Sequence, residues 1–176
     1  MAIFLAKAIA GAGELVPRTG LLGAEPYDCS PGGVSKFADV STMGAFCKHV
    51  YYLAAQNVTL GCNPSAYCPA QTITRDAMAS FIAKAVVAPK GGAGVPLTYG
   101  SDPDTGRSYS CDTGSPNLYF TDIAASNAFC KHIHFLWAKG IVDGCTATTY
   151  CPGQPVARDA MAKFLVNAFG LELYGP

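Results

Sequence analysis

The chain has 176 residues; half of them are apolar, 14% are charged, and 12 basic side chains balance 12 acidic ones. This length and apolar content are enough to bury a core, so we expect one domain or two small ones. A neutral, sparsely charged chain has no basic stripe for phosphates, which argues against a nucleic-acid-binding protein and against a polybasic membrane-surface protein. Such a surface suits self-association. No stretch reaches the roughly 20 apolar residues that a membrane span requires.

The first segment, residues 1–13, is apolar and ends in small residues like a short signal peptide, but Lys7 lies inside the apolar run rather than before it. Internal similarity gives a better interpretation, because Met1–Ala8 matches Met78–Ala85 and Met161–Ala168. We therefore expect residues 1–13 to be the second helix of a truncated repeat, so that the chain begins in the middle of a repeat.

Two full repeats follow, and each has a leading segment rich in Gly, Pro and Ser. Their cores, residues 37–87 and 120–170, align without a gap and share Phe-x-Asp, Ala-Phe-Cys-Lys-His, Gly-Cys, Tyr-Cys-Pro and Arg-Asp-Ala-Met-Ala-x-Phe. With the leading segments, the repeats occupy residues 14–88 and 89–176. One such unit is too small to bury its apolar face alone, so we expect the units to pack on one another.

Each core has the pattern of a helix, a loop and a second helix. In the first repeat, apolar residues at three- and four-residue spacing predict a helix that starts near residue 41 or 45 and ends near 56. Turn residues then reverse the chain. Thr74 is a good N-cap for the second helix, and Asp76 in its first turn favours the positive end of the helix dipole. Ala157 occupies the cap position in the second repeat, which weakens that helix start.

The eight cysteines form two sets of four with nearly the repeat offset, which indicates disulfides in an oxidising compartment or metal sites in a reducing one. Zinc ligands usually have about two to four residues between them, and no histidine stands at a matching spacing, so we favour disulfides. Two pairs close small loops, and elimination under the repeat symmetry gives the other two. The expected bonds are Cys62–Cys68, Cys145–Cys151, Cys29–Cys47 and Cys111–Cys130.

Two further patterns are candidate sites. Asp102 and Asp104 have the spacing that starts a calcium loop, but Thr113 stands at the twelfth position, where an acidic ligand is required, so a turn is the favoured interpretation. Asn57 begins a glycosylation sequon, with an unmodified side chain as the alternative.

Catalytic patterns are lacking. No serine lies in a nucleophile elbow, and cysteines in disulfides cannot act as nucleophiles. His132 and His134 are two residues apart, so they point to different faces of a helix, and His49 matches His132. We expect structural roles for the histidines, no enzymatic activity and no cofactor.

The repeats resemble S-layer homology repeats, which begin with Phe-x-Asp-Val, end the first helix near Gly-Ile-x-x-Gly, carry an aromatic residue and a proline in the loop, and open the second helix with Thr-Arg. The chain is also similar to the cysteine-containing variant from the C-termini of large secreted bacterial surface proteins. The matching residues are Phe37, Asp39, Val40, Gly61, Tyr67, Pro69, Ile73, Thr74 and Arg75 in the first repeat, and Phe120, Asp122, Ile123, Gly140, Ile141, Gly144, Tyr150, Pro152, Val156 and Arg158 in the second.

This resemblance implies a mainly α fold, in which helix–loop–helix repeats form a pseudo-threefold bundle and long irregular segments are tied on by disulfides. It also implies an extracellular location on a bacterial cell surface. In several family members the arginine of a Thr-Arg-Ala-Glu motif binds a pyruvylated cell-wall polysaccharide, because a guanidinium pairs with a carboxylate. The glycan-binding candidates here are Thr74, Arg75, Arg158, Tyr67 and Tyr150.

The arginine motif reads Thr-Arg-Asp-Ala in the first repeat and Ala-Arg-Asp-Ala in the second, so the family's glutamate is absent. The alternative for Arg75 and Arg158 is therefore an exposed pair with the neighbouring aspartate.

Two functions remain open from the sequence. The first is a non-catalytic extracellular cell-surface module, structural or anchoring, whose partner is cell-wall polysaccharide. The alternative is a self-assembling layer or filament subunit whose partners are other copies of itself. An accessible groove beside Arg75 or Arg158 would favour the first function. Grooves filled by the chain's own segments or by another subunit would favour the second.

Overall fold

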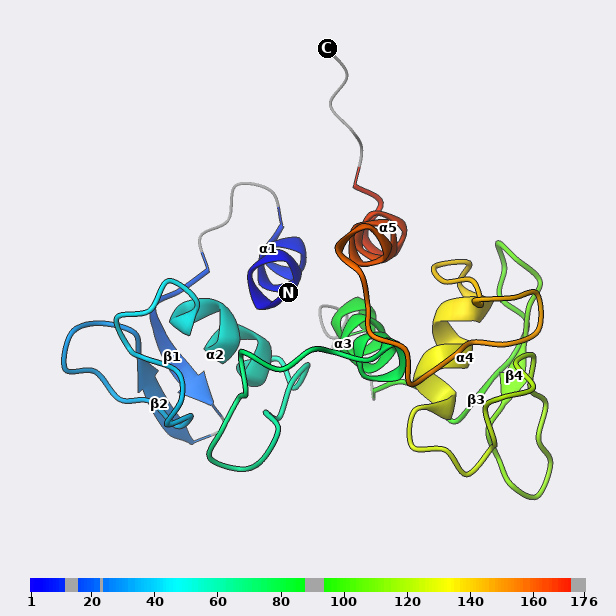
Figure 1. Ribbon diagram of the computed structural model, residues 1–176, viewed down its shortest axis with the longest axis horizontal. Coiled ribbons are helices and arrows are strands. Elements are labelled where there is room, and N and C mark those ends of the chain that lie inside the picture. The colour runs from blue at the N-terminus through cyan, green and yellow to red at the C-terminus, as the bar shows by residue number, and fades with distance from the viewer. Residues whose placement is uncertain (12–15, 23, 88–93, 172–176) are drawn as a thin grey trace, which may run out of the picture. The chain divides into compact units, whose positions relative to one another are not determined.

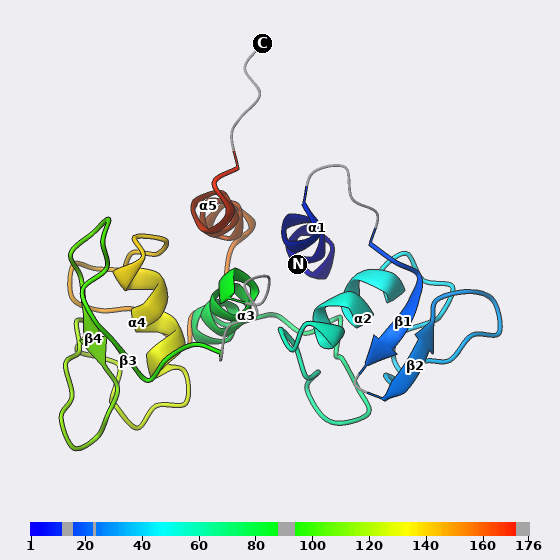
Figure 2. The ribbon, with the colours of Figure 1, turned by 180° about the vertical axis from the view of Figure 1, so that it is seen from behind.

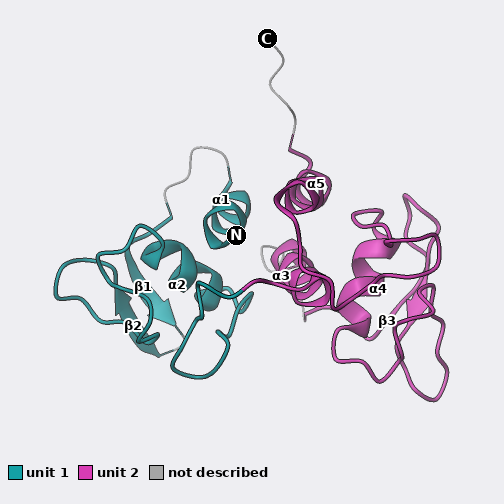
Figure 3. Cartoon of the chain, in the orientation of Figure 1, with its two compact units in different colours: residues 1–71 teal, residues 72–176 magenta. Residues whose placement is uncertain are grey.

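A computed structural model describes residues 1–11, 16–22, 24–87 and 94–171. The chain divides into two compact units, Met1–Gln71 and Thr72–Pro176 (Figure 3). The expected repeat boundaries at residues 13/14 and 88/89 lie outside the described residues. The boundary between the units falls inside the first repeat, between its loop and its second helix.

Unit 1 contains two helices and one hairpin in its described part. These are α1 (Ala2–Ala10), β1 (Thr19–Leu22), β2 (Glu25–Asp28) and α2 (Cys47–Ala55). The strands pair antiparallel from Thr19 opposite Asp28 to Leu22 opposite Glu25. Helix α1 packs against α2 through its buried Leu5 and Ala6, and β1 contacts the same helix (Figure 1).

Unit 2 contains three helices and one shorter hairpin in its described part. These are α3 (Arg75–Val87), β3 (Thr98–Tyr99), β4 (Tyr109–Ser110), α4 (Cys130–Ala138) and α5 (Arg158–Phe169). Helix α3 packs against both α4 and α5, and β4 lies against α4 (Figure 2). The second helix of one repeat therefore packs on the first helix of the next, as α1 packs on α2 and α3 on α4.

The expectation of a mainly α, pseudo-threefold bundle is wrong. The described helices are only nine to thirteen residues long and cover well under half of the chain. Residues 41–46 form turns with hydrogen bonds between residues three apart, so α2 begins at Cys47, later than expected. The helices also group as a pair and a set of three rather than as three equal wedges.

The leading segments are hairpins where irregular chain was expected. Each hairpin buries a tyrosine against the first helix of its repeat: the ring of Tyr27 stacks on Tyr51 at 5.1 Å, and the ring of Tyr109 lies 6.0 Å from that of His134. The residue that follows each hairpin, Cys29 or Cys111, is bonded to the first residue of α2 or α4. A buried ring and a covalent bond thus hold each short hairpin, which would be marginal alone.

All eight cysteines are in disulfides, in the four pairs that the repeat symmetry predicts: Cys29–Cys47, Cys62–Cys68, Cys111–Cys130 and Cys145–Cys151. The prediction of disulfide bonding is confirmed, and four such bonds fit an extracellular or secreted protein. None of the described helices has the length and apolar character to cross a bilayer.

Candidate functional site

Arg75, the first residue of α3, is held by the loop of the second repeat. Its Nε donates to the carbonyl of Tyr150 at 2.9 Å, and its Nη2 donates to the carbonyl of Asp143 at 3.0 Å. The guanidinium carbon lies 4.7 Å from the centre of the Tyr150 ring and 5.6 Å from that of Phe164. Tyr150 completes the contact by donating its hydroxyl to the carbonyl of Arg75 at 3.1 Å. The chain's own loop therefore binds two of the nitrogens of this guanidinium.

The backbone donors at the start of α3 are occupied in the same way. The N–H of Arg75 donates to the carbonyl of Gln154 at 2.9 Å, and the N–H of Asp76 donates to the carbonyl of Pro152 at 3.2 Å. Thr74 forms an antiparallel bridge with Pro155 and donates its hydroxyl to Asp76 Oδ1 at 2.5 Å. A helix N-terminus attracts an anion through such donors, and here the second repeat's loop supplies carbonyl acceptors instead.

The two loop tyrosines are in different environments. Tyr150 is fully buried, its ring 5.3 Å from that of Phe120, and burial raises the pKa of its hydroxyl. Tyr67, its equivalent in unit 1, is partly exposed and lies 5.9 Å from the ring of Phe37. Only Tyr67 therefore has a ring surface that a sugar could reach.

Arg158 begins α5 and is exposed, with no polar side-chain contact among the described residues. Its N-cap residue, Ala157, makes no side-chain capping hydrogen bond, and within the described ranges Asp159 accepts only from the N–H of Ala160, at 2.8 Å. The structure thus brings Thr74, Arg75 and Tyr150 together, and Arg158 makes no polar side-chain contact with them.

Two aspartates of the repeated Phe-x-Asp motif, which were not among the candidate site residues, hold the repeat loops. Asp39 accepts hydrogen bonds from the N–H groups of Tyr67 and Cys68 at 2.8 and 2.7 Å, and Asp122 accepts from those of Tyr150 and Cys151 at the same distances. The N–H of Tyr67 is the main cause of a lowered pKa for Asp39. The repeated Phe-x-Asp motif was the signal for this role.

Two different side chains at equivalent positions, Tyr51 in the first repeat and His134 in the second, accept the same backbone hydrogen bond. The hydroxyl of Tyr51 accepts from the N–H of Phe37 at 2.7 Å, and Nε2 of His134 accepts from the N–H of Phe120 at 3.3 Å. Nδ1 of His134 then carries the proton and donates to the carbonyl of Cys130 at 3.0 Å. His134 is therefore a neutral, structural side chain.

We expect stability to fall as the pH drops below the ordinary histidine pKa of 6.5, because burial lowers the pKa of His134. The unfolded state then binds a proton that the folded state does not, so the stability present above pH 6.5 is lost as the pH falls toward the folded pKa. Urea unfolding between pH 7 and 4 measures this slope. His134→Gln should flatten it in part, since His49 and His132 have lowered pKa values too. An unchanged slope in the variant would refute the assignment.

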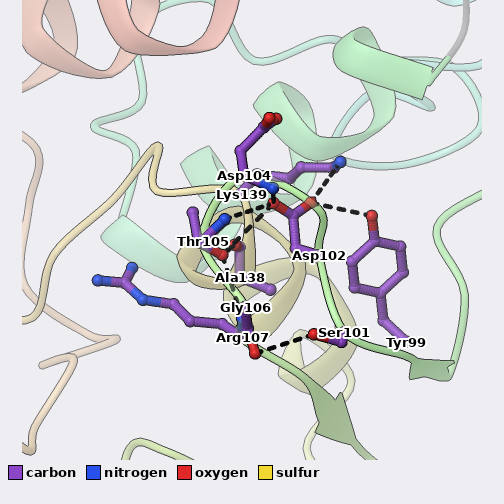
Figure 4. Close-up of polar contacts among 9 residues, drawn as sticks. All are labelled: Tyr99, Ser101, Asp102, Asp104, Thr105, Gly106, Arg107, Ala138 and Lys139. Atoms are coloured by element: carbon purple, nitrogen blue, oxygen red, sulfur yellow. Dashed lines mark hydrogen bonds and ion pairs between the residues drawn. The ribbon is translucent and has the colours of Figure 1, made fainter.

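Asp102, the first residue of the calcium candidate, has a carboxylate that is already fully engaged (Figure 4). The residue is 2% exposed. One oxygen accepts from Lys139 Nζ at 2.6 Å and from the hydroxyl of Tyr99 at 3.1 Å, and the other accepts from the N–H groups of Asp104 and Thr105 at 3.0 and 3.1 Å. The ammonium of Lys139 is the main reason that the pKa of Asp102 lies well below its usual range.

This loop closes the C-terminal end of α4. Thr105 donates its hydroxyl to the carbonyl of Ala138 at 2.5 Å, and Arg107 donates to the carbonyl of Trp137 at 2.8 Å. The carboxylate of Asp104 is exposed and points away from that of Asp102 in Figure 4. Because the two aspartates do not converge and one already neutralises a lysine, the geometry favours a capping loop over a calcium site.

The remaining candidates are a group of possible metal ligands and the glycosylation sequon at Asn57. Cys111, Cys130 and His134 have ligand atoms within 4.8 Å of one another, but the two sulfurs are bonded to each other and both nitrogens of His134 are hydrogen-bonded, so the group is not free to hold a metal. Asn57 is exposed with a φ of 56°, and Thr59 of its sequon is buried.

A scan against protein-family models, a search of curated proteins and a search of solved structures each find no match to this chain. The contacts of Arg75 and the four disulfides are therefore the observations from which a function can be inferred.

Proposed function

We propose that the chain is a non-catalytic structural module of a bacterial cell surface, of S-layer homology type, whose repeats pack on one another and on neighbouring copies. The main support for the proposal is that a loop of the same chain already binds the side chain of Arg75. In the family that the sequence resembles, this position is a ligand-binding arginine. Here Nε and Nη2 of its guanidinium bond to the carbonyls of Tyr150 and Asp143, so its role is repeat-to-repeat packing.

The exposed face of α5 supports association with further subunits. Ala83 on α3 is fully buried, whereas Val166, at the matching position of α5, is 40% exposed. Ala79 is likewise buried and its counterpart Ala162 is exposed. Two positions that are buried on the second helix of the first repeat thus carry exposed apolar residues on that of the second, where a further subunit could pack.

Four disulfides support an extracellular setting, because such bonds persist in oxidising compartments. Neutral net charge and low charge density support association without electrostatic repulsion.

Anchoring to cell-wall polysaccharide is the second candidate, and the observation that favours it is Arg158. This guanidinium is exposed at the start of α5 and has no polar contact among the described residues. A carboxylate on a polysaccharide could pair with it there, whereas the same ligand would have to displace a loop from Arg75.

Light scattering of the non-reduced protein across concentration tests the proposal, with and without purified cell-wall polysaccharide. We expect the mass to rise with protein concentration in the absence of polysaccharide. Val166→Glu should suppress this rise, and Val34→Glu, at an exposed apolar residue of unit 1, should not. A monomer whose mass rises only with polysaccharide, and no longer does so in Arg158→Ala, would establish the anchoring function instead.

A further inference from the structure

A cavity of about 340 Å³ lies within unit 1, at the C-terminal end of α2. Its lining includes Ala54 and Ala55 of that helix, Leu22 at the end of β1, and the neighbouring pair Lys36 and Phe37. Phe37 and Ala54 are buried at its floor, whereas Lys36 is exposed at its rim. Small-molecule sites in proteins typically measure about 300–1,000 Å³, so this volume is that of a site for a small ligand.

Unit 2 offers a direct comparison, because the first helices of the two repeats end in the same backbone geometry. After α2 the N–H of Val58 donates to the carbonyl of Leu53 at 2.9 Å, and after α4 the N–H of Ile141 donates to the carbonyl of Leu136 at the same distance. The repeat cores also align without a gap. Residues at the same repeat position therefore have equivalent places in the two units.

Aromatic side chains stand at the equivalent place in unit 2. Trp137 replaces Ala54, and Tyr119 replaces Lys36. The two rings stack with their centres 4.2 Å apart and their planes 18° from parallel, and the indole also lies edge-on to Phe120 at 6.4 Å. A small side chain in place of a large one leaves a cavity, and an apolar cavity of this origin can bind a small aromatic molecule such as benzene.

A hydrogen-bond acceptor also lines the cavity. In unit 2 the hydroxyl of Thr105 donates to the carbonyl of Ala138 at the end of α4. Ala55 has the equivalent position in unit 1 and lines the cavity, and within the described ranges no side chain donates to its carbonyl. A ligand that carries a hydroxyl or an N–H group could supply this donor.

Lys36 is available to cover a ring in the cavity. Its ammonium is 3.9 Å from the carboxylate of Glu25, and both side chains are exposed, so the pair is weak. An ammonium over an aromatic face is favourable, and the edge of Phe37 provides a second aromatic contact.

We propose that this cavity binds a small planar aromatic molecule with a hydroxyl or an N–H group, of the phenol or indole class. The ring takes the place that the indole of Trp137 has in unit 2, against Phe37 and Ala54. The hydroxyl or N–H donates to the carbonyl of Ala55. The site lies within one unit and does not depend on the structural role proposed above.

NMR titration of the full, oxidised, ¹⁵N-labelled chain with 4-fluorophenol tests the site. We expect saturable shifts at the amides of Ala55, Asn57 and Thr59, which belong to the lining, with a dissociation constant on the order of 1 mM. Fluorobenzene lacks the donor and cyclohexanol lacks the aromatic ring, so each should bind roughly fivefold more weakly.

Two substitutions place the side chains of unit 2 in unit 1. Ala54→Trp should abolish binding, because its indole fills the cavity. Lys36→Tyr is the second variant, in case the first does not fold, since it changes an exposed residue; we expect it to weaken binding about tenfold or more by occupying the same space. Lys36→Gln removes only the charge and should stay within about fivefold of the unsubstituted chain. Leu21→Ala, at an exposed residue outside the lining, should leave the affinity unchanged.

The proposal is overturned if the shifts do not saturate, if they map to other residues, or if Lys36→Tyr binds as tightly as Lys36→Gln. Equal affinity for cyclohexanol and 4-fluorophenol would overturn the aromatic assignment. A tyrosine-containing tripeptide that binds where 4-fluorophenol and indole do not would overturn the assignment to a small molecule in favour of a side chain of a partner protein.

Discussion

Replacement of Arg75 by alanine is expected to lower the free energy of unfolding of unit 2 by about 2–4 kcal/mol. The side chain donates charge-assisted hydrogen bonds to two carbonyls of the second repeat's loop and lies over the ring of the buried Tyr150. Alanine removes both bonds and the cation–π contact, and it leaves the two carbonyls without their donors. Arg75→Lys keeps the charge but cannot fork between two acceptors, so we expect a loss of intermediate size.

Arg158→Ala is the matched control, because the same residue at the same repeat position is exposed and makes no polar side-chain contact among the described residues. We expect a change within about 0.5 kcal/mol. Urea unfolding of the oxidised protein, followed by the fluorescence of Trp137, reports on unit 2 because this is the single tryptophan of the chain. Equal losses in the two alanine variants would mean that Arg75 does not hold the loop.

The double variant Cys111→Ala/Cys130→Ala is expected to lose about 3 kcal/mol of unfolding free energy on the chain-entropy model, because its disulfide closes a loop with a sequence separation of 19 residues. Without this bond, the hairpin β3–β4 is held to α4 only by non-covalent contacts, namely the packing of Tyr109 and Tyr99 and the polar contacts of the loop that contains Asp102. Differential scanning calorimetry and urea unfolding at neutral pH would measure the loss.

Cys145→Ala/Cys151→Ala is the comparison, because its bond spans a separation of only 6 residues and should cost about 2 kcal/mol on the same model. The loop that it closes also keeps the hydrogen bonds from Tyr150 and Cys151 to Asp122. A larger loss for the short loop than for the long one would show that loop entropy does not govern the contribution of these bonds.

Local features of the fold could be read from the sequence. Helices α3 and α5 begin at the arginines that follow the predicted cap positions Thr74 and Ala157, and α2 ends at Ala55, one residue before the expected end. Helix propensity, apolar periodicity and turn residues act over a few neighbouring residues, so they leave a visible pattern. The hairpins left none, because strands of two to four residues gain their stability from the helix that they cover.

The candidate site was also predictable only in part from the sequence. The sequence located Thr74, Arg75 and Tyr150 as special positions, but it could not show that they contact one another, because Arg75 and Tyr150 are 75 residues apart in the chain. It also treated Arg75 and Arg158 as equivalents, whereas in the fold Arg75 is half-buried and hydrogen-bonded to a loop and Arg158 is exposed.

By itself, the sequence determined the duplication, the helical segments and the cysteine pairing, since each follows from spacing along the chain. Only the tertiary structure decided which faces are covered and which charged groups have partners. Those properties depend on segments that meet across the fold, and two residues followed by the same Asp-Ala-Met-Ala sequence, Arg75 and Arg158, can therefore have different environments.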